Sequence, residues 1–178
     1  MVKILAIAVG VGLGGWYYVS SSRINEQQVH AFYETASHAF YARDPEAMCQ
    51  LHSDKFTGRE RVTALGVTQE ATVSRDQVCE SAQASFQMFE KIGSQMGGML
   101  TIEYNYRIDN ITITNGRKRA RVTGNRLIKM GETVMQFDSD FTDEIEREWG
   151  KTRLVRSDSH TRMRIAGGQA MGQSGFFK

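Results

Sequence analysis

Alternating apolar and polar residues over positions 100–165 constrain the fold of this chain most. In LTIEYNYRID, residues 100–109, every second side chain is apolar: Leu100, Ile102, Tyr104, Tyr106 and Ile108. This period-two pattern predicts a strand buried on one face. Turn sequences follow at Asn115-Gly116, Met130-Gly131-Glu132 and Trp149-Gly150-Lys151. The stretch is therefore predicted to form four antiparallel strands in a meander, with one apolar face that needs cover.

Three helices are predicted before these strands. The first begins at Asn25, which forms a capping pair with Gln28. It carries an apolar stripe at helical spacing: Val29, Phe32, Tyr33, Ala36 and Phe40. Asp44-Pro45 starts a second, short helix that is predicted to end near Leu51 or His52, because Asp is a good N-cap and Pro fits the first helical position.

The third helix is predicted to begin after Ser74, which forms a capping box with Gln77, and to end at Gly93. Its buried stripe would consist of Val78, Ala82, Phe86, Phe89 and Ile92. Residues 53–73 are less regular. We expect one short strand or extended segment there, from Lys55 to Val62.

The N-terminal segment, residues 1–22, has a composition of its own. Ile4–Val19 carries no charge, and three serines extend the uncharged run to Arg23. At about 1.5 Å per residue this run reaches about 28 Å, enough to cross the hydrocarbon core of a bilayer. Lys3 predicts a cytoplasmic N-terminus, and Trp16-Tyr17-Tyr18 would lie at the far interface. A cleaved secretory signal is the alternative, and both readings send the domain across the membrane. No polar face interrupts the run, which disfavours a cytosolic core helix.

The rest of the chain is predicted to form one domain, residues 23–166, followed by a disordered glycine-rich tail at 167–178. With 22 basic and 20 acidic residues the formal net charge is +2, which gives no argument for nucleic-acid binding. Cys49 and Cys79 fall on the second and third helices. In an oxidising compartment they are candidates for one disulfide, and two buried thiols are the alternative.

Three helices followed by a bent four-strand meander resemble the NTF2-like superfamily of cone-shaped α+β domains. The residues that carry the resemblance are VHAFYETASHAFYARDPEAMCQLHSDKF (29–56), SRDQVCESAQASFQMFEKIG (74–93) and the strands of 100–165. The resemblance implies an α+β fold: three helices packed in a curved antiparallel sheet of four to five strands, with a conical pocket between them. With an N-terminal anchor, the chain is also distantly similar to VirB8-type subunits of type IV secretion machines.

The pocket implied by this fold would be lined by eight aromatic residues: Phe32, Tyr33, Phe86, Phe89, Tyr104, Tyr106, Phe137 and Phe141. The alternative is that these rings fill the cone as core. Strand alternation places Asp138, Asp140, Asp158 and His160 on the opposite face. We therefore expect no acid in the pocket and no catalytic residue. No metal-binding motif is present, so neither a metal nor another cofactor is expected.

These observations predict a non-catalytic docking or assembly module of an envelope complex. It would be single-pass, held through Ile4–Val19, with its domain on the periplasmic side of a bacterial inner membrane. Its partners would be envelope proteins or a second copy of the chain. Two alternatives stay open: a carrier or sensor of a small apolar ligand in the aromatic pocket, and an enzyme of the isomerase or dehydratase type.

Overall fold

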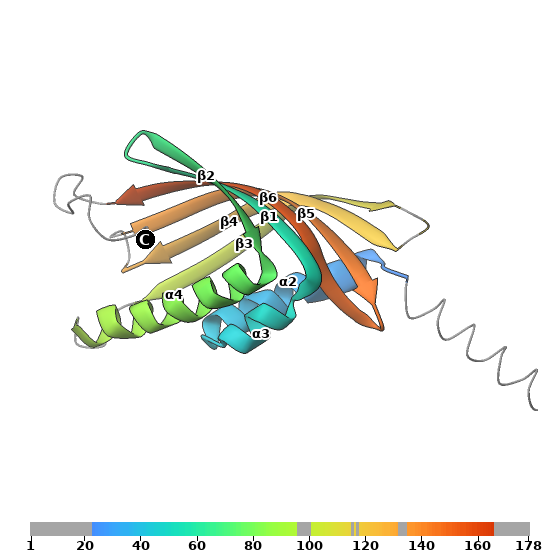
Figure 1. Cartoon of the computed structure of the whole chain (residues 1–178), viewed down its shortest axis with the longest axis horizontal. Coiled ribbons are helices and arrows are strands. Elements are labelled where there is room, and N and C mark those ends of the chain that lie inside the picture. Colours follow the sequence, from blue (N-terminus) through green and yellow to red (C-terminus); the bar gives the residue numbers. More distant parts are fainter. Residues whose placement is uncertain (1–22, 96–100, 115, 117, 132–134, 166–178) are drawn as a thin grey trace, which may run out of the picture.

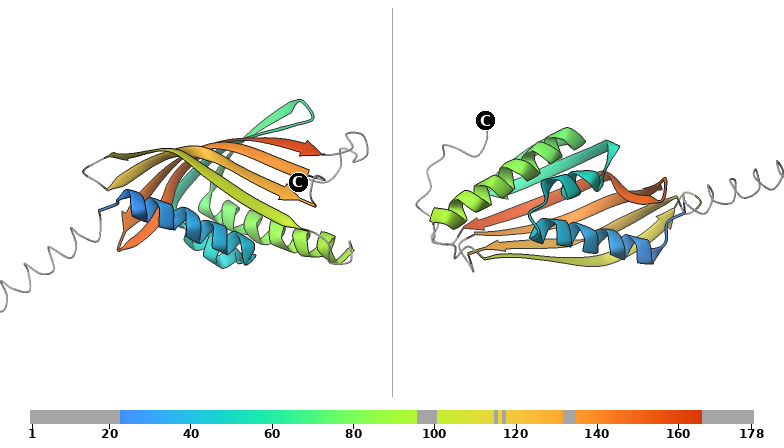
Figure 2. Two further views of the ribbon diagram at one scale, coloured as in Figure 1. Left: turned by 180° about the vertical axis from the view of Figure 1, so that it is seen from behind. Right: turned by 90° about the horizontal axis from the view of Figure 1, so that it is seen from below.

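The structure, a computed structural model, describes residues 23–95, 101–114, 116, 118–131 and 135–165. In this part of the chain one curved sheet of six strands carries three helices on one face (Figures 1 and 2). The helices are α2 (Glu26–Tyr41), α3 (Pro45–Gln50) and α4 (Arg75–Gln95). The strands are β1 (His52–Ala64), β2 (Val67–Ser74), β3 (Ile102–Thr114), β4 (Arg119–Met130), β5 (Met135–Glu148) and β6 (Lys151–Ile165).

The predicted anchor at residues 1–22 and the predicted tail at 167–178 lie outside the described residues. Within the described ranges, no helix combines the length and the apolar character needed to span a bilayer.

The sheet has the order β2-β1-β6-β5-β4-β3, and all neighbours pair antiparallel except β1 and β6, which are parallel. The predicted meander is therefore present as β3 to β6. The expectation of four to five strands was wrong, because residues 52–74 form two long strands instead of one short segment. The strand β2 is exposed almost throughout, so it lacks the alternation of apolar residues that would have indicated a strand.

Turn geometry follows the predicted turn residues in part. Trp149 and Gly150 both have positive φ, 51° and 79°, and join β5 to β6 in a two-residue turn. Between β3 and β4, the last pair is Thr114 with Arg119, and Asn115 of the predicted turn lies outside the described residues. At the end of α4 the helix continues past Gly93 to Gln95, two residues beyond the predicted end.

The predicted helix caps are present. The Asn25 side chain accepts a hydrogen bond from the Gln28 backbone N–H at 2.9 Å, and the Gln28 side chain accepts from the Asn25 N–H at 3.0 Å. Asp44 accepts the backbone N–H of Ala47 at 2.9 Å. The predicted capping box at Ser74 is also present: the Ser74 N–H donates to the Gln77 side chain, and the Gln77 N–H donates to the Ser74 hydroxyl. These contacts satisfy backbone N–H groups that have no partner within the helix.

Register shifts between neighbouring strands affect which side chains face the helices. The β3–β4 register shifts at Asp109, so β3 turns its even-numbered residues inward up to Ile108 and its odd-numbered residues from Ile111. The β5–β6 register shifts at Val155. Gly124 of β4 lies at the first irregularity, and a Cβ there would collide with the carbonyl oxygen of Arg107 and the ring of Phe141. Close packing of the strands therefore requires glycine at this position.

Two apolar clusters fill the space between helices and sheet. One gathers the first half of α2 with the middle of the sheet: Ile24, Val29, Phe32, Tyr33, Phe56, Ala120, Val122, Phe141, Ile145 and Leu154. The other lies between α4, the C-terminal end of β4 and the N-terminal end of β5, and is centred on Phe86, Phe89 and Met130. A disulfide between Cys49 and Cys79, with Cα atoms 4.9 Å apart, ties α3 to α4. The helices are thus fixed to one another as well as to the sheet.

Candidate functional site

The eight aromatic residues expected to line a pocket lie between helices and sheet, and most of them belong to one or other of the two apolar clusters. Five are buried (Phe32, Tyr33, Phe86, Phe89 and Phe141), and Tyr104, Tyr106 and Phe137 are half-buried. The centre of the Tyr33 ring lies 5.6 Å from the centres of the Tyr106 and Phe141 rings. The ring centres of Phe40 and Tyr104 are 4.8 Å apart. Spacings of this size are those of packed aromatic rings. These side chains fill the cone at the positions described.

An acid lies inside the cone, against our expectation. Asp143 on β5 is 0% exposed and shares the inner face with Phe141 and Ile145. Its Oδ1 accepts a hydrogen bond from the Ser157 hydroxyl at 2.7 Å, and its Oδ2 accepts one from the Tyr33 hydroxyl at 2.9 Å. The prediction that no acid faces the helices was therefore wrong.

The charge of Asp143 is balanced by Arg126 on β4, whose guanidinium forms a salt bridge with Oδ2. The same guanidinium lies 4.1 Å from the centre of the Phe141 ring, in cation–π geometry. Burial raises the pKa of the Tyr33 hydroxyl, and the negative charge of Asp143 raises it further. Tyr33 is thus held as a neutral donor. We call Tyr33, Arg126, Asp143 and Ser157 the inner polar cluster.

His52 lies beside this cluster at the start of β1. Its Nδ1 donates a hydrogen bond to the Met48 carbonyl oxygen at 3.0 Å. Its ring packs edge-to-face with the Phe56 ring, and the two ring centres are 4.6 Å apart. Burial lowers the pKa of His52, and the nearby charge of Arg126 lowers it further, against the opposing hydrogen bond. The imidazole is therefore neutral at neutral pH.

A second acid belongs to the inner face by alternation along β1. Glu60 follows Phe56 and Gly58 on the same face of this strand. Its side chain is exposed, yet partial burial raises its pKa while the charge of Arg126 lowers it. Glu60 forms no ion pair with the described residues.

The inner polar cluster was missed although the alternation pointed to it. Asp143 has the same parity as Phe137 and Phe141 on β5, and Arg126 has the same parity as Val122 and Ile128 on β4. Asp143 is the next inward position after Phe141 on β5, and Arg126 on the neighbouring strand is the counter-ion that a buried acid requires.

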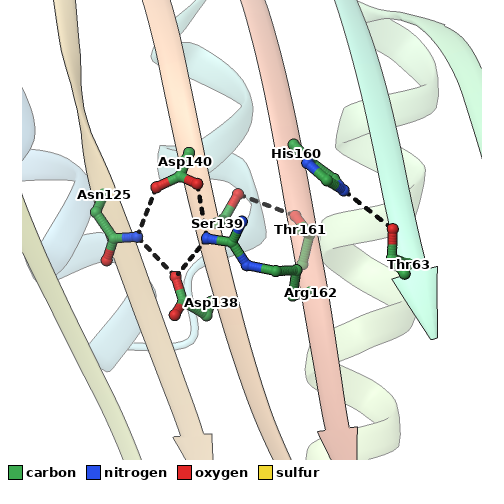
Figure 3. Close-up of polar contacts among 8 residues, drawn as sticks. All are labelled: Thr63, Asn125, Asp138, Ser139, Asp140, His160, Thr161 and Arg162. Carbon is green, nitrogen blue, oxygen red and sulfur yellow. Dashed lines mark hydrogen bonds and ion pairs between the residues drawn. The ribbon is translucent and has the colours of Figure 1, made fainter. Parts of the chain in front are cut away.

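Asp138, Asp140 and His160 lie on the outer face, as expected (Figure 3). Asp140 accepts hydrogen bonds from Asn125 at 3.1 Å and Arg162 at 2.7 Å, and these contacts lower its pKa. Asp138 accepts from Asn125 at 2.7 Å. His160 lies 3.0 Å from the Thr63 hydroxyl of β1.

Asp158 forms a salt bridge with Arg61 at 3.3 Å, also across the outer face. The four residues predicted on the outer face, Asp138, Asp140, Asp158 and His160, thus form polar contacts across the strands of that face and do not reach the inner polar cluster. In the described ranges, no three His, Cys, Asp or Glu side chains gather in a way that could hold a metal ion.

A hollow of about 480 Å³ opens on the surface over β1, β5 and β6. Its lining is mostly charged and contains none of the eight predicted pocket residues: Lys55, Thr57, Gly58, Arg59, Thr72, Arg119, Glu144, Glu146, Glu148, Val155 and Arg156. Arg119 is engaged by Glu144 and Glu146, and Arg59 by Glu70. Lys55 and Arg156 form no ion pair with any residue that the structure describes.

Comparisons with known proteins bear on the fold. No protein-family model matches the sequence, and no curated protein matches it either. An NTF-2 like protein of unknown function from Shewanella oneidensis MR-1 has a similar structure. It is 14% identical with a TM-score of 0.56, and the match covers 75% of this chain and 97% of that one.

Two further structures are similar. A conserved protein from Planctomyces limnophilus DSM 3776 is 15% identical, with a TM-score of 0.56 and coverage of 76% and 94%. A ketosteroid isomerase-like protein from Erwinia carotovora atroseptica SCRI1043 is 13% identical, with a TM-score of 0.50 and coverage of 78% and 98%. At these identities the similarity shows the fold alone, and the fold of this chain is NTF2-like.

Proposed function

We propose that this NTF2-like domain is a non-catalytic docking module that binds a protein partner over the outer face of its sheet. The observation that carries the proposal is the location of the surface hollow and of the charged side chains without an ion-pair partner among the described residues. The interior is occupied by aromatic rings and by an acid whose charge is already balanced. A charged hollow lies over the outside of β1, β5 and β6.

The inner polar cluster is suited to holding the fold and poorly suited to chemistry. Both oxygens of Asp143 are engaged, and its side chain has no exposed surface. A general base must reach the proton that it removes. Asp143 would have to give up Tyr33 or Arg126 first, leaving a buried charge unpaired, which is costly.

The charges of the outer hollow suggest the chemistry of its partner. Lys55 and Arg156 point to a partner segment that carries acidic side chains, while Arg59 and Arg119 are engaged within the domain. A lining that is mostly charged does not favour a small apolar ligand, which would need an apolar cavity. Charge complementarity of this kind would set partner choice and association rate.

We also propose that residues 1–22 anchor the domain on the periplasmic side of a bacterial inner membrane. The uncharged run Ile4–Val19 supports the anchor. The bridge between Cys49 and Cys79 supports an oxidising compartment, because such bridges are rare where thiols are kept reduced. An anchor raises the effective concentration of the domain for partners in the same membrane.

Quantitative affinity purification from native membranes tests the docking role. The full chain, the double variant Lys55→Glu/Arg156→Glu and a control, Lys91→Glu on α4, are compared. We expect one protein to be captured by the wild type and the control and to be lost with the double variant. The captured protein must also bind the purified full chain directly. Equal capture by all three chains would refute the role of the hollow.

An enzyme is the second candidate, and Glu60 is the observation that favours it. A carboxylate with a raised pKa that faces the helix side of the sheet and lacks an ion-pair partner is suited to proton transfer. One similar structure is described as ketosteroid isomerase-like. Assays of the wild type and Glu60→Gln with isomerase and dehydratase substrates separate the two candidates. Turnover that Glu60→Gln abolishes would support the enzyme and contradict a purely docking role.

A further inference from the structure

The strand β2 forms one edge of the sheet in the part of the chain that the structure describes. It pairs only with β1, so along its other side the backbone has no partner strand among the described residues. Its sequence, VTQEATVS, contains no lysine and no proline, and its register with β1 is regular, without a bulge. Lysine, proline and bulges are among the features by which proteins usually block pairing along a sheet edge. At the tip of the β1–β2 hairpin, Leu65 and Val67 are 75% and 61% exposed.

The hairpin register identifies the backbone groups that point outward. Leu65 and Gly66 form a two-residue turn with φ of 51° and 82°, so the flanking pair Ala64–Val67 is hydrogen-bonded within the hairpin. Hydrogen-bonded and non-hydrogen-bonded pairs alternate along an antiparallel ladder. The N–H and C=O groups of three residues therefore point away from β1: Thr68, Glu70 and Thr72.

The sequence of this edge is nearly the same in both directions around Glu70; only Gln69 and Ala71 differ. Residues 67–73 read V-T-Q-E-A-T-V, so Val67 mirrors Val73 and Thr68 mirrors Thr72. Antiparallel pairing of two identical strands about Glu70 would set Val against Val, Thr against Thr and Glu70 against itself, while Gln69 would lie opposite Ala71. Thr–Thr pairs and β-branched apolar pairs are favourable across strands. Only this register brings all three outward residues opposite one another, giving about six backbone hydrogen bonds.

We propose that two copies of the chain associate through β2, antiparallel, with the two-fold axis at Glu70. Thr68 of each copy pairs with Thr72 of the other, and Glu70 pairs with its own counterpart. The two six-stranded sheets would then form one continuous sheet. In Figure 1 the tip of the β1–β2 hairpin projects from the sheet, away from the helices.

The charge at the axis limits the strength of this contact. The two Glu70 carboxylates would approach each other, but each is already paired with Arg59 on its own β1 at 3.2 Å. The repulsion is therefore reduced and not removed, so association should be weak and should strengthen when Glu70 is neutral. This inference does not rest on the docking role, because it is argued from the backbone and sequence of β2 alone, although Thr72 also lines the outer hollow.

Cysteine cross-linking of the full chain in a mild detergent tests the register. The native cysteines are bridged, so Glu70→Cys introduces the one free thiol. In the proposed dimer its two copies have Cα atoms about 5.5 Å apart, within disulfide range. The control Gln69→Cys faces Ala71 of the second copy, with its own counterpart about 8 Å away. We expect a covalent dimer with Glu70→Cys and at least tenfold less with Gln69→Cys. No dimer, or equal amounts from both variants, would overturn the proposal.

Two backbone and charge variants test the same axis by light scattering. Glu70→Pro removes one outward N–H and leaves the bonds to β1 in place, so it should yield a folded monomer, with folding checked by circular dichroism. Should Glu70→Pro unfold, Glu70→Lys decides. It should be monomeric alone and form mixed dimers with the wild type, because residue 70 meets residue 70 only at this axis. A Glu70→Lys chain that dimerises as well as the wild type would overturn the proposal.

Discussion

The inner polar cluster should contribute measurably to stability, and Asp143→Asn tests how much. The substitution keeps the shape of the side chain and removes the charge that balances Arg126. Removing one partner of a buried ion pair usually costs about 3–5 kcal/mol, because the other charge stays buried. The Arg126 side chain keeps 25% of its surface exposed, so solvent relieves part of the penalty. We expect a loss of about 3 kcal/mol.

Tyr33→Phe probes the same cluster from the helix side. It removes a hydrogen bond to a charged acceptor, which is worth about 1.5–3 kcal/mol. Because Tyr33 and Asp143 are in contact, the double variant should lose about 1 kcal/mol less than the sum of the single losses. A charge-removing control is Asp138→Asn on the outer face, where partial exposure keeps the expected cost below about 1 kcal/mol.

Urea unfolding at neutral pH with the disulfide intact measures all four variants. The comparison is valid if the dependence of the unfolding free energy on urea is unchanged between them. A loss of less than about 1 kcal/mol for Asp143→Asn would refute the reasoning. Additive losses in the double variant would show that the two side chains do not act together.

Three further outcomes are expected. The folded-state pKa of His52 is depressed below its unfolded value; the unfolded chain therefore takes up the proton first, and stability should fall as pH drops below about 6.5. Replacing His52 by Asn should flatten this part of the pH profile of unfolding. Reducing the bridge between Cys49 and Cys79, which are 30 residues apart, should cost about 3–4 kcal/mol in urea unfolding, and no change on reduction would contradict this. Gly124→Ala should destabilise by about 1–3 kcal/mol, because the new methyl group meets backbone of β3, and an unchanged unfolding midpoint would count against this close approach.

The sequence predicted the elements whose signals are local. The caps at Asn25, Asp44 and Ser74 and the turn at Trp149-Gly150 depend on a few neighbouring residues, and they appear as expected. Strand alternation predicted the orientation of Asp138 correctly. It did so because this part of β5 has a regular register with β4 and β6.

The rest depended on contacts between segments far apart in the chain. β2 has no buried face, so its pairing with β1 left no periodic signal. The bulge at Asp109 changes the inward parity of β3, which alternation alone does not reveal. The buried position of Asp143 was not predicted, because an acid is expected inside an apolar core only when its counter-ion is known. Arg126 lies 17 residues away on another strand.

In-cell photo-crosslinking tests most directly whether the domain works by docking over its outer hollow. A photoreactive amino acid is placed at Thr57, which lines the hollow, and, as a control, at Lys91, which is exposed on α4. Docking predicts one discrete cross-linked product with the Thr57 probe that disappears in the Lys55→Glu/Arg156→Glu background, and none with the Lys91 probe. The absence of a product from Thr57, or the same product from both positions, would contradict it.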